Sequence, residues 1–257
     1  MHHTTALPVR ALRLARLGLH LLRGVLTVAT VYPRLAQAER AVITQRWSRQ
    51  LLHILAIKVK VCGNPPGVYP PNTLVVANHV SWLDIFALNS VTVSRFVAKK
   101  ELRDWPVAGF LVKNAGTLFI DRANRRDASR VNQQLAQALH DGGCMAVFPE
   151  ATTSDGRGLL PFKASLFEAA RLACANVQPV AIRFTTPGGQ FCEAAAYAGD
   201  TTFWQSICQI LRTRAMVVEV HYTAAITQAE CASQTRFLLS DTSRRRIADA
   251  LQLPADA

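Results

Sequence analysis

One histidine and one aspartate are spaced so that they can share a proton at a turn between a strand and a helix. Asn78 and His79 follow the apolar run Thr73–Ala77, and Asp84 comes five residues after His79. A carboxylate on one ring nitrogen fixes the tautomer and stabilises the imidazolium, so that the other nitrogen can take a proton from a hydroxyl group. The spacing is unspecific, and it also fits an ordinary turn histidine followed by a charge at a helix start.

Other polar residues follow the ends of other short apolar runs. They are Asp121 and Arg122 after Thr117–Ile120, Glu150 after Met145–Phe148, and Arg183 and Thr185 at the end of Val180–Phe184. Because α/β sheets carry their chemistry at the carboxyl ends of strands, we expect these side chains to converge near His79. A guanidinium at a strand end is a sound phosphate ligand, and an ion pair with a neighbouring aspartate is the structural alternative for Arg122. A helix cap or salt bridge is the alternative for Glu150.

Short runs rich in valine and isoleucine alternate with helical stretches from residue 58 onward. The predicted strands are Lys58–Val61, Thr73–Ala77, Arg95–Ala98, Thr117–Ile120, Met145–Phe148, Val180–Phe184 and Val217–His221. The predicted helices are Trp82–Asn89, Trp105–Asn114, Arg126–His140, Phe162–Ala175, Phe203–Leu211 and Asp241–Leu251. This alternation predicts an α/β fold with a mixed, largely parallel sheet flanked by helices. We expect an N-terminal membrane-associating helical segment over residues 1–57 and the α/β domain over residues 58–257.

Composition excludes several classes of protein. Half of the 257 residues are hydrophobic and 18% are charged, which excludes wholesale disorder. Six scattered cysteines contain no CxxC pair, so neither a metal site nor a small disulfide framework is indicated. Scattered cysteines in an apolar chain are typical of reduced core residues, which places the domain in contact with the cytosol.

The positive charge is concentrated at the front of the chain. The formal net charge is +12, and residues 1–60 hold ten of the 29 basic residues but one of the 17 acidic ones. These arginines are interspersed with leucines and valines, as in segments that face anionic lipid. A nucleic-acid-binding arm is more often basic and poor in apolar residues, so we expect membrane lipids rather than nucleic acid as the partner.

The apolar stretch over residues 17–33 has three interpretations. A short or re-entrant membrane helix and an interfacial helix are two of them, because Arg23 and His20 interrupt a run shorter than the roughly 20 residues of a spanning helix. The third is a signal peptide cleaved after Ala38, which would make the protein a secreted enzyme; Arg23 and Arg34 argue against it.

A second front segment has the pattern of an amphipathic helix. Apolar residues recur at helical spacing on one stripe, and basic or polar residues recur on another. The apolar stripe is Trp47, Leu51, Ile54 and Leu55, and the polar one is Arg46, Arg49, Gln50 and His53. Two interpretations remain open: a surface helix packed on its own domain, or a helix that lies on a bilayer.

Four short blocks together resemble the glycerolipid acyltransferases, in particular the lysophosphatidic-acid acyltransferase group. The blocks are NHVSWLD (78–84), GTLFIDR (116–122), FPEAT (148–152) and VQPVAI (177–182), and they are similar to that family's NHxxxxD, GxxFxxR, FPEGT and VxPVxI motifs in the family's order. The resemblance covers roughly residues 58–225. It implies that His79 is the general base on the acceptor hydroxyl, that Asp84 orients it, and that no covalent acyl-enzyme forms.

The resemblance also implies an acceptor site. Arg122 would grip the headgroup phosphate, and the block that contains Glu150 would bind or position the acceptor. Asn78, Gly116 and Thr152 complete the expected substrate-binding set. The glycine would let the backbone pass close to another element.

One position departs from the family pattern. The family usually has glycine where this chain has Ala151, and alanine lacks glycine's freedom at positive φ. The stretch after Glu150 and the later YAGD (197–200) also resemble members that acylate lyso-ornithine lipid. That acceptor has no phosphate, and Arg122 would then meet a carboxylate instead.

The expected activity is transfer of a fatty acyl group to the hydroxyl of a lysolipid. The acceptor would be 1-acyl-sn-glycerol-3-phosphate, with lyso-ornithine lipid as the alternative. The donor would be acyl-CoA or acyl-carrier protein, with no cofactor and no metal, at the cytoplasmic face of the inner membrane through residues 10–57. A different class of function is a non-catalytic lipid-binding membrane scaffold, against which the intact His79 and Asp84 argue.

Overall fold

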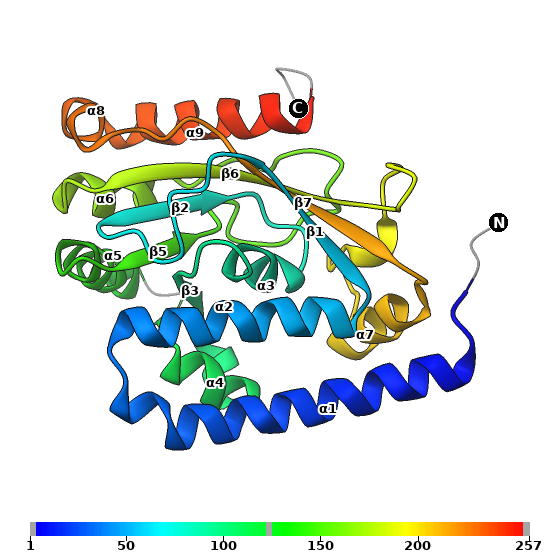
Figure 1. The fold of residues 1–257 in the computed structure, drawn as a ribbon. Coiled ribbons are helices and arrows are strands. Elements are labelled where there is room, and N and C mark those ends of the chain that lie inside the picture. The colour runs from blue at the N-terminus through cyan, green and yellow to red at the C-terminus, as the bar shows by residue number, and fades with distance from the viewer. Residues whose placement is uncertain (1–3, 122–124, 254–257) are drawn as a thin grey trace.

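A seven-stranded sheet runs through the centre of the computed structural model, which describes residues 4–121 and 125–253 (Figure 1). The strands are β1 (Ile57–Gly63), β2 (Thr73–Ala77), β3 (Arg95–Lys99), β4 (Leu118–Ile120), β5 (Cys144–Val147), β6 (Asn176–Thr185) and β7 (Met216–Tyr222), in the order β1-β7-β6-β2-β5-β3-β4. The five strands from β6 to β4 are parallel, whereas β7 and β1 run together in the opposite direction. The prediction of a mixed, largely parallel sheet is confirmed.

Helices cover both faces of this sheet (Figure 1). They are α1 (Leu7–Thr30), α2 (Gln37–Ile54), α3 (Leu83–Asn89), α4 (Ala108–Asn114), α5 (Arg125–His140), α6 (Glu168–Leu172), α7 (Phe203–Arg212), α8 (Gln228–Ser233) and α9 (Arg236–Leu251). Alternate residues of one strand point to opposite faces, so β2 contributes side chains to the hydrophobic cores on both faces of the sheet. Val75 and Ala77 pack in the core beneath α2, α3 and α7, while Leu74 and Val76 pack in the core beneath α5, α6 and α9.

Four helical segments differ from the sequence prediction, and one of them is α9, which begins at Arg236 rather than at the predicted Asp241. The predicted helix Phe162–Ala175 is wrong in extent, because the chain forms a 3₁₀ turn over Ala164–Phe167 before the five residues of α6. Helix α4 begins at Ala108, after a separate 3₁₀ turn over Lys100–Asp104. Helix α8 was not predicted, since it is only six residues long and polar, and it starts at a Thr227 capping box.

The apolar stripe of α2 belongs to the protein core. Leu51 and Leu55 are 1% exposed and Ile54 is 9% exposed, and all three pack on the sheet. The interpretation of α2 as a surface helix packed on its own domain is therefore correct, and the alternative that this stripe faces a bilayer is wrong.

Helix α1 lies on the outside of α2 and exposes a different stripe. Leu17 and Val28 face the domain, whereas Leu12, Leu19 and Leu26 recur every seventh residue on the outer side and are each more than half exposed. The stretch from α1 through Arg34 is long and apolar enough to cross a membrane, and little of it is buried. A long apolar helix with an unburied leucine stripe indicates that the chain associates with a membrane.

Candidate active site

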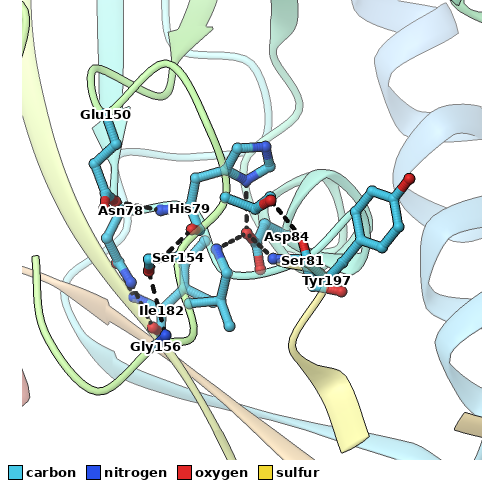
Figure 2. A network of polar contacts seen from close by, with 11 residues as sticks. Asn78, His79, Ser81, Asp84, Glu150, Ser154, Gly156, Ile182 and Tyr197 are labelled. Carbon is cyan, nitrogen blue, oxygen red and sulfur yellow. Dashed lines mark hydrogen bonds and ion pairs between the residues drawn. The ribbon is translucent and has the colours of Figure 1, made fainter. Parts of the chain in front are cut away.

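The His79 and Asp84 side chains meet in the turn between β2 and α3, as their spacing predicts. His79 Nδ1 lies 2.8 Å from Asp84 Oδ2 (Figure 2). The same oxygen accepts hydrogen bonds from the backbone amides of Val80 at 2.7 Å and Ser81 at 2.8 Å. Asp84 is fully buried at the start of α3, where free amides and the helix dipole favour negative charge. Because an ionised carboxylate can only accept, His79 Nδ1 carries the proton and Nε2 is left as the acceptor.

The imidazole ring is held on its flat side as well as at its edge. The ring of Phe148, which follows β5, stacks on it with centroids 3.9 Å apart and planes 10° apart. The His79 side chain keeps 19% of its surface exposed, and its second nitrogen points away from Asp84 (Figure 2). The histidine is thus fixed in orientation while one basic nitrogen is available to a substrate hydroxyl.

Glu150 supports the backbone of the turn. Its Oε1 accepts the amide of His79 at 2.7 Å and its Oε2 accepts the amide of Leu160 at 3.0 Å. Burial raises the pKa of the Glu150 carboxyl, and the two amide hydrogen bonds oppose that rise. Both oxygens are therefore engaged with the main chain, and this side chain joins the β2–α3 turn to the loop after β5.

Asn78 joins the turn to the neighbouring strand. Its amide group donates to the carbonyl of Ile182 at 2.9 Å and accepts from the amide of Ile182 at 2.7 Å, so β2 is fastened to β6 one residue before His79. Both amide ends are satisfied inside the protein, as a buried side chain requires.

Two loops, one after Glu150 and one around Tyr197, complete the site. The amide of Ser154 donates to the carbonyl of His79 at 2.8 Å, and the amide of Tyr197 donates to the carbonyl of Val80 at 2.9 Å (Figure 2). The hydroxyl of Thr153 donates to the carbonyl of Tyr197 and so joins the two loops. The bonds from Ser154 and Tyr197 join main-chain atoms, so residue types alone could not predict them.

Ala151 adopts the left-handed conformation that the family pattern assigns to glycine. Its φ is +60°, and its amide donates to the carbonyl of Phe148 at 3.0 Å. The turn after Phe148 therefore keeps this conformation with an alanine, at a cost of about 1 kcal/mol.

Two of the expected acceptor residues, Thr152 and Gly116, form no hydrogen bond with His79 or Asp84 within the described residues. Thr152 is exposed and forms no hydrogen bond within the described part of the chain. Gly116, with φ of +81°, precedes β4, and a Cβ there would lie 2.5 Å from Arg95 Nε; the expected close approach of the backbone is present. Arg122 lies outside the described residues. Asp121, before it, pairs with Lys100 at 2.6 Å.

The expected contribution of Arg183 is wrong. Its guanidinium pairs with Glu219 of β7 at 3.1 Å and reaches the carbonyl of Leu251 in α9 at 3.5 Å, on the α9 face of the sheet. The cause is the two-residue period of a strand: Arg183 points away from the face on which its neighbour Ile182 packs. Thr185 is buried at the last position of β6.

Comparison with known proteins agrees with this geometry. Residues 62–183 match the family model described as Acyltransferase. The 1-acyl-sn-glycerol-3-phosphate acyltransferase of Neisseria meningitidis serogroup B is 40% identical over 217 residues, which are 84% of this chain and 83% of that protein. The lyso-ornithine lipid O-acyltransferase of Pseudomonas aeruginosa is 37% identical over 79% of this chain and 77% of that protein.

A solved structure has the same fold. The crystal structure of the 1-acyl-sn-glycerophosphate acyltransferase PlsC from Thermotoga maritima superimposes with a TM-score of 0.68 at 18% identity, covering 95% of this chain and 96% of that one. The sequence relatives and the shared fold together show that this chain is an enzyme of the acyltransferase family.

Proposed function

We propose that this acyltransferase moves a fatty acyl group from a thioester to the free hydroxyl of 1-acyl-sn-glycerol-3-phosphate, which gives phosphatidic acid. The observation that carries the proposal is the buried Asp84 carboxylate on His79 Nδ1, which leaves Nε2 as a base at a partly exposed ring edge. Relatives 40% identical to this chain are named for this acceptor.

The reaction needs one proton relay and no covalent enzyme intermediate. His79 Nε2 takes the hydroxyl proton as the acceptor oxygen attacks the thioester carbonyl. The C–S bond then breaks, and the imidazolium returns its proton to the departing thiolate. Asp84 stabilises the imidazolium in between, and its burial keeps competing water away from the carboxylate.

We assign the other site residues to two roles: positioning His79 and binding the acceptor headgroup. Glu150 and Asn78 act as positioning residues, since their polar atoms are bonded to the main chain on either side of His79. Arg122 is the proposed ligand of the acceptor phosphate, because its planar guanidinium can bind phosphate with two hydrogen bonds. We keep Gly116 and Thr152 as members of the acceptor site.

The donor and the membrane face complete the proposal. We propose acyl-CoA or acyl-carrier protein as the donor, because both present a soluble thioester and neither calls for a cofactor. The leucine stripe of α1 would place the enzyme on the cytoplasmic face of the inner membrane, where a lysolipid acceptor resides.

Lyso-ornithine lipid is the second candidate acceptor. Relatives in Pseudomonas aeruginosa and Rhizobium meliloti that are 37% and 33% identical are named lyso-ornithine lipid O-acyltransferases. In that case Arg122 would bind the ornithine carboxylate, which is also a planar bidentate acceptor.

An acceptor panel tests the proposal. The purified chain is given lysophosphatidic acid or lyso-ornithine lipid with each donor, and thiol release is followed together with product mass. We expect turnover with lysophosphatidic acid that is lost in His79→Ala. Turnover with lyso-ornithine lipid alone would transfer the assignment to the second candidate. Thiol release that needs no acceptor would reject acyl transfer to either lipid.

A further inference from the structure

A groove with a volume of about 480 Å³ lies between α1 and α2, apart from the His79 network. It is lined by Arg16, Leu19, His20 and Arg23 of α1 and by Arg49, Gln50, His53 and Ile54 of α2. Three guanidinium groups and two imidazoles thus surround one opening, and none of the lining side chains is a carboxylate. Cations gathered without a counter-ion repel one another, so a bound anion would lower the energy of this groove.

Arg16 and Arg23 of the groove differ from Arg13 and Arg34 in what their guanidinium groups contact. Arg13 donates to the carbonyls of Thr213 and Arg214, and Arg34 donates to the carbonyl of Thr30. The guanidinium groups of Arg16 and Arg23 form no hydrogen bond and no ion pair within residues 4–121 and 125–253, and the carbonyl of Arg23 accepts from the Thr27 hydroxyl. Their donors are available to an external acceptor.

The groove lies beside the exposed leucine stripe. Arg16 and Arg23 are seven residues apart and flank Leu19, so they lie on one side of α1, about 40–60° around the helix from the stripe. When leucines enter the acyl region of a bilayer, neighbouring arginines extend to the level of the lipid phosphates. This arrangement distinguishes a lipid headgroup from a soluble anion as the occupant.

The walls of the groove are fixed. The His20 ring stacks on the Trp47 ring at 4.6 Å, and its Nε2 lies 3.0 Å from the Trp47 carbonyl oxygen. Helices α1 and α2 approach closely at Gly24, where a Cβ would lie 2.8 Å from Trp47 Nε1. On the other wall, Arg49 Nε donates to the carbonyl of Ser90 at 2.7 Å, which holds its guanidinium in place. A preformed site binds an anion with little loss of conformational entropy.

We propose that the α1–α2 groove binds the phosphodiester of an anionic membrane phospholipid, held by Arg16, Arg23 and Arg49. This is a site for a bilayer lipid that is not the acceptor, and it goes beyond the proposed acyl transfer. It gives the enzyme a preference for anionic membranes through one defined lipid rather than through charge spread over the front of the chain.

Calorimetry with short-chain lipids tests the site. The full chain in neutral detergent is titrated with dihexanoylphosphatidylglycerol, with dihexanoylphosphatidylcholine and with inorganic phosphate. We expect one saturable site for the anionic lipid, with affinity at least about tenfold above that for the zwitterionic lipid and for free phosphate. Equal affinity for the two lipids would overturn the proposal, and so would phosphate that binds as tightly as the anionic lipid.

A matched pair of double variants separates the groove from diffuse charge. Arg16→Gln with Arg23→Gln removes two charges from the groove, and Arg34→Gln with Arg46→Gln removes two from exposed positions of the same region outside it. We expect the first pair to lower affinity for the anionic lipid at least about tenfold and the second to change it less than about threefold. Equal losses would reject a defined site.

Activity in neutral detergent tests whether the groove is separate from the acceptor site. Thiol release with lysophosphatidic acid should stay within about twofold of the parent in the groove variant, because none of its residues contacts His79 or Asp84. A parallel loss of detergent activity and lipid binding would show that the groove serves the acceptor, and would overturn its assignment to a separate lipid.

Discussion

The described residues include two histidine–carboxylate pairs whose surroundings differ. His79 and Asp84 lie in a strand-to-helix turn, 2.8 Å apart, and the carboxylate receives two backbone amides besides the imidazole. His221 and Glu219 lie two residues apart on β7, with Nε2 3.4 Å from Oε2. The second carboxylate is shared with Lys60 at 2.8 Å and Arg183 at 3.1 Å.

The difference shows that the neighbours of a carboxylate decide how strongly it acts on a nearby histidine. The Lys60 and Arg183 cations lower the pKa of Glu219 to about 2, and Arg183 contacts the same oxygen as His221. Among the described residues, no lysine or arginine forms an ion pair with Asp84. The side chain that its carboxylate contacts is the imidazole of His79. The first carboxylate orients one imidazole ring, whereas the second belongs to an ion-pair cluster that joins three strands.

The largest expected difference between the two pairs is the loss of kcat when each histidine is replaced by alanine. His79→Ala should lower kcat with lysophosphatidic acid by about 10³-fold, since positioned general bases contribute 10²–10⁴-fold. His221→Ala should leave kcat within about twofold, because that ring contacts only the ion-pair cluster. Steady-state thiol release on both variants checks this. Comparable losses in the two would break the distinction between the pairs.

The carboxylates give a second, smaller contrast. Asp84→Asn keeps the size of the side chain but removes the charge that supports the imidazolium, and kcat should fall by about 10²-fold with KM changed less than about threefold. Steady-state thiol release at varied acceptor concentration measures both constants. A variant that keeps the parent kcat would mean that Asp84 serves only to build the turn.

Glu219 should matter for stability rather than for turnover. Its folded pKa of about 2 lies below the ordinary value of 4.5, so its stabilising contribution is present above pH 4.5 and is lost as pH falls toward 2. Glu219→Gln should lower the free energy of unfolding by about 2 kcal/mol at pH 7 and by much less near pH 2.5, as measured by urea unfolding. Glu193→Gln, at an exposed ion pair with Arg157, is the control and should change stability very little. Equal effects of Glu219→Gln at both pH values would contradict the ion-pair account.

The smallest effect concerns the backbone beside the catalytic turn. Ala151→Gly should raise the free energy of unfolding by about 0.5 kcal/mol, because glycine adopts φ of +60° without strain. Ala115→Gly, at φ of −73° and equally small, should lower it by a similar amount. Thermal unfolding of the two variants tests the difference in sign. Destabilisation by both would show that the conformation of Ala151 costs nothing.

The sequence predicted the sheet well because its signal is local. Every predicted strand is present, since a short run of valine and isoleucine bounded by turn residues is read directly from the chain. The His79–Asp84 contact was predictable for the same reason, because both residues belong to one turn. The polar and short α8 carries no apolar period and was missed.

The remaining features depend on tertiary packing. The apolar stripe of α2 is buried because the sheet lies beneath it. Periodicity alone fits a stripe that packs on the domain and a stripe that faces a bilayer equally well. Arg183 was assigned to the wrong face because a shift of one residue along a strand reverses the side. The bonds from Ser154 and Tyr197 to the turn involve backbone amides, which every residue type possesses. The roles of the site residues, and the division at residue 57, stay predictions.

The position of β1 at the edge of the sheet governs the order of assembly. Ile57 pairs with Met216, so β1, which is synthesised first, pairs with β7, which is synthesised last of the seven strands. Both edges of β1 are therefore unpaired until β7 has been made. The leucine-bearing front helix emerges earlier still and can reach the bilayer before the sheet closes. Insertion of β7 between β1 and β6 is then the step that completes the sheet, and truncation ahead of residue 216 would leave two strand edges prone to aggregation.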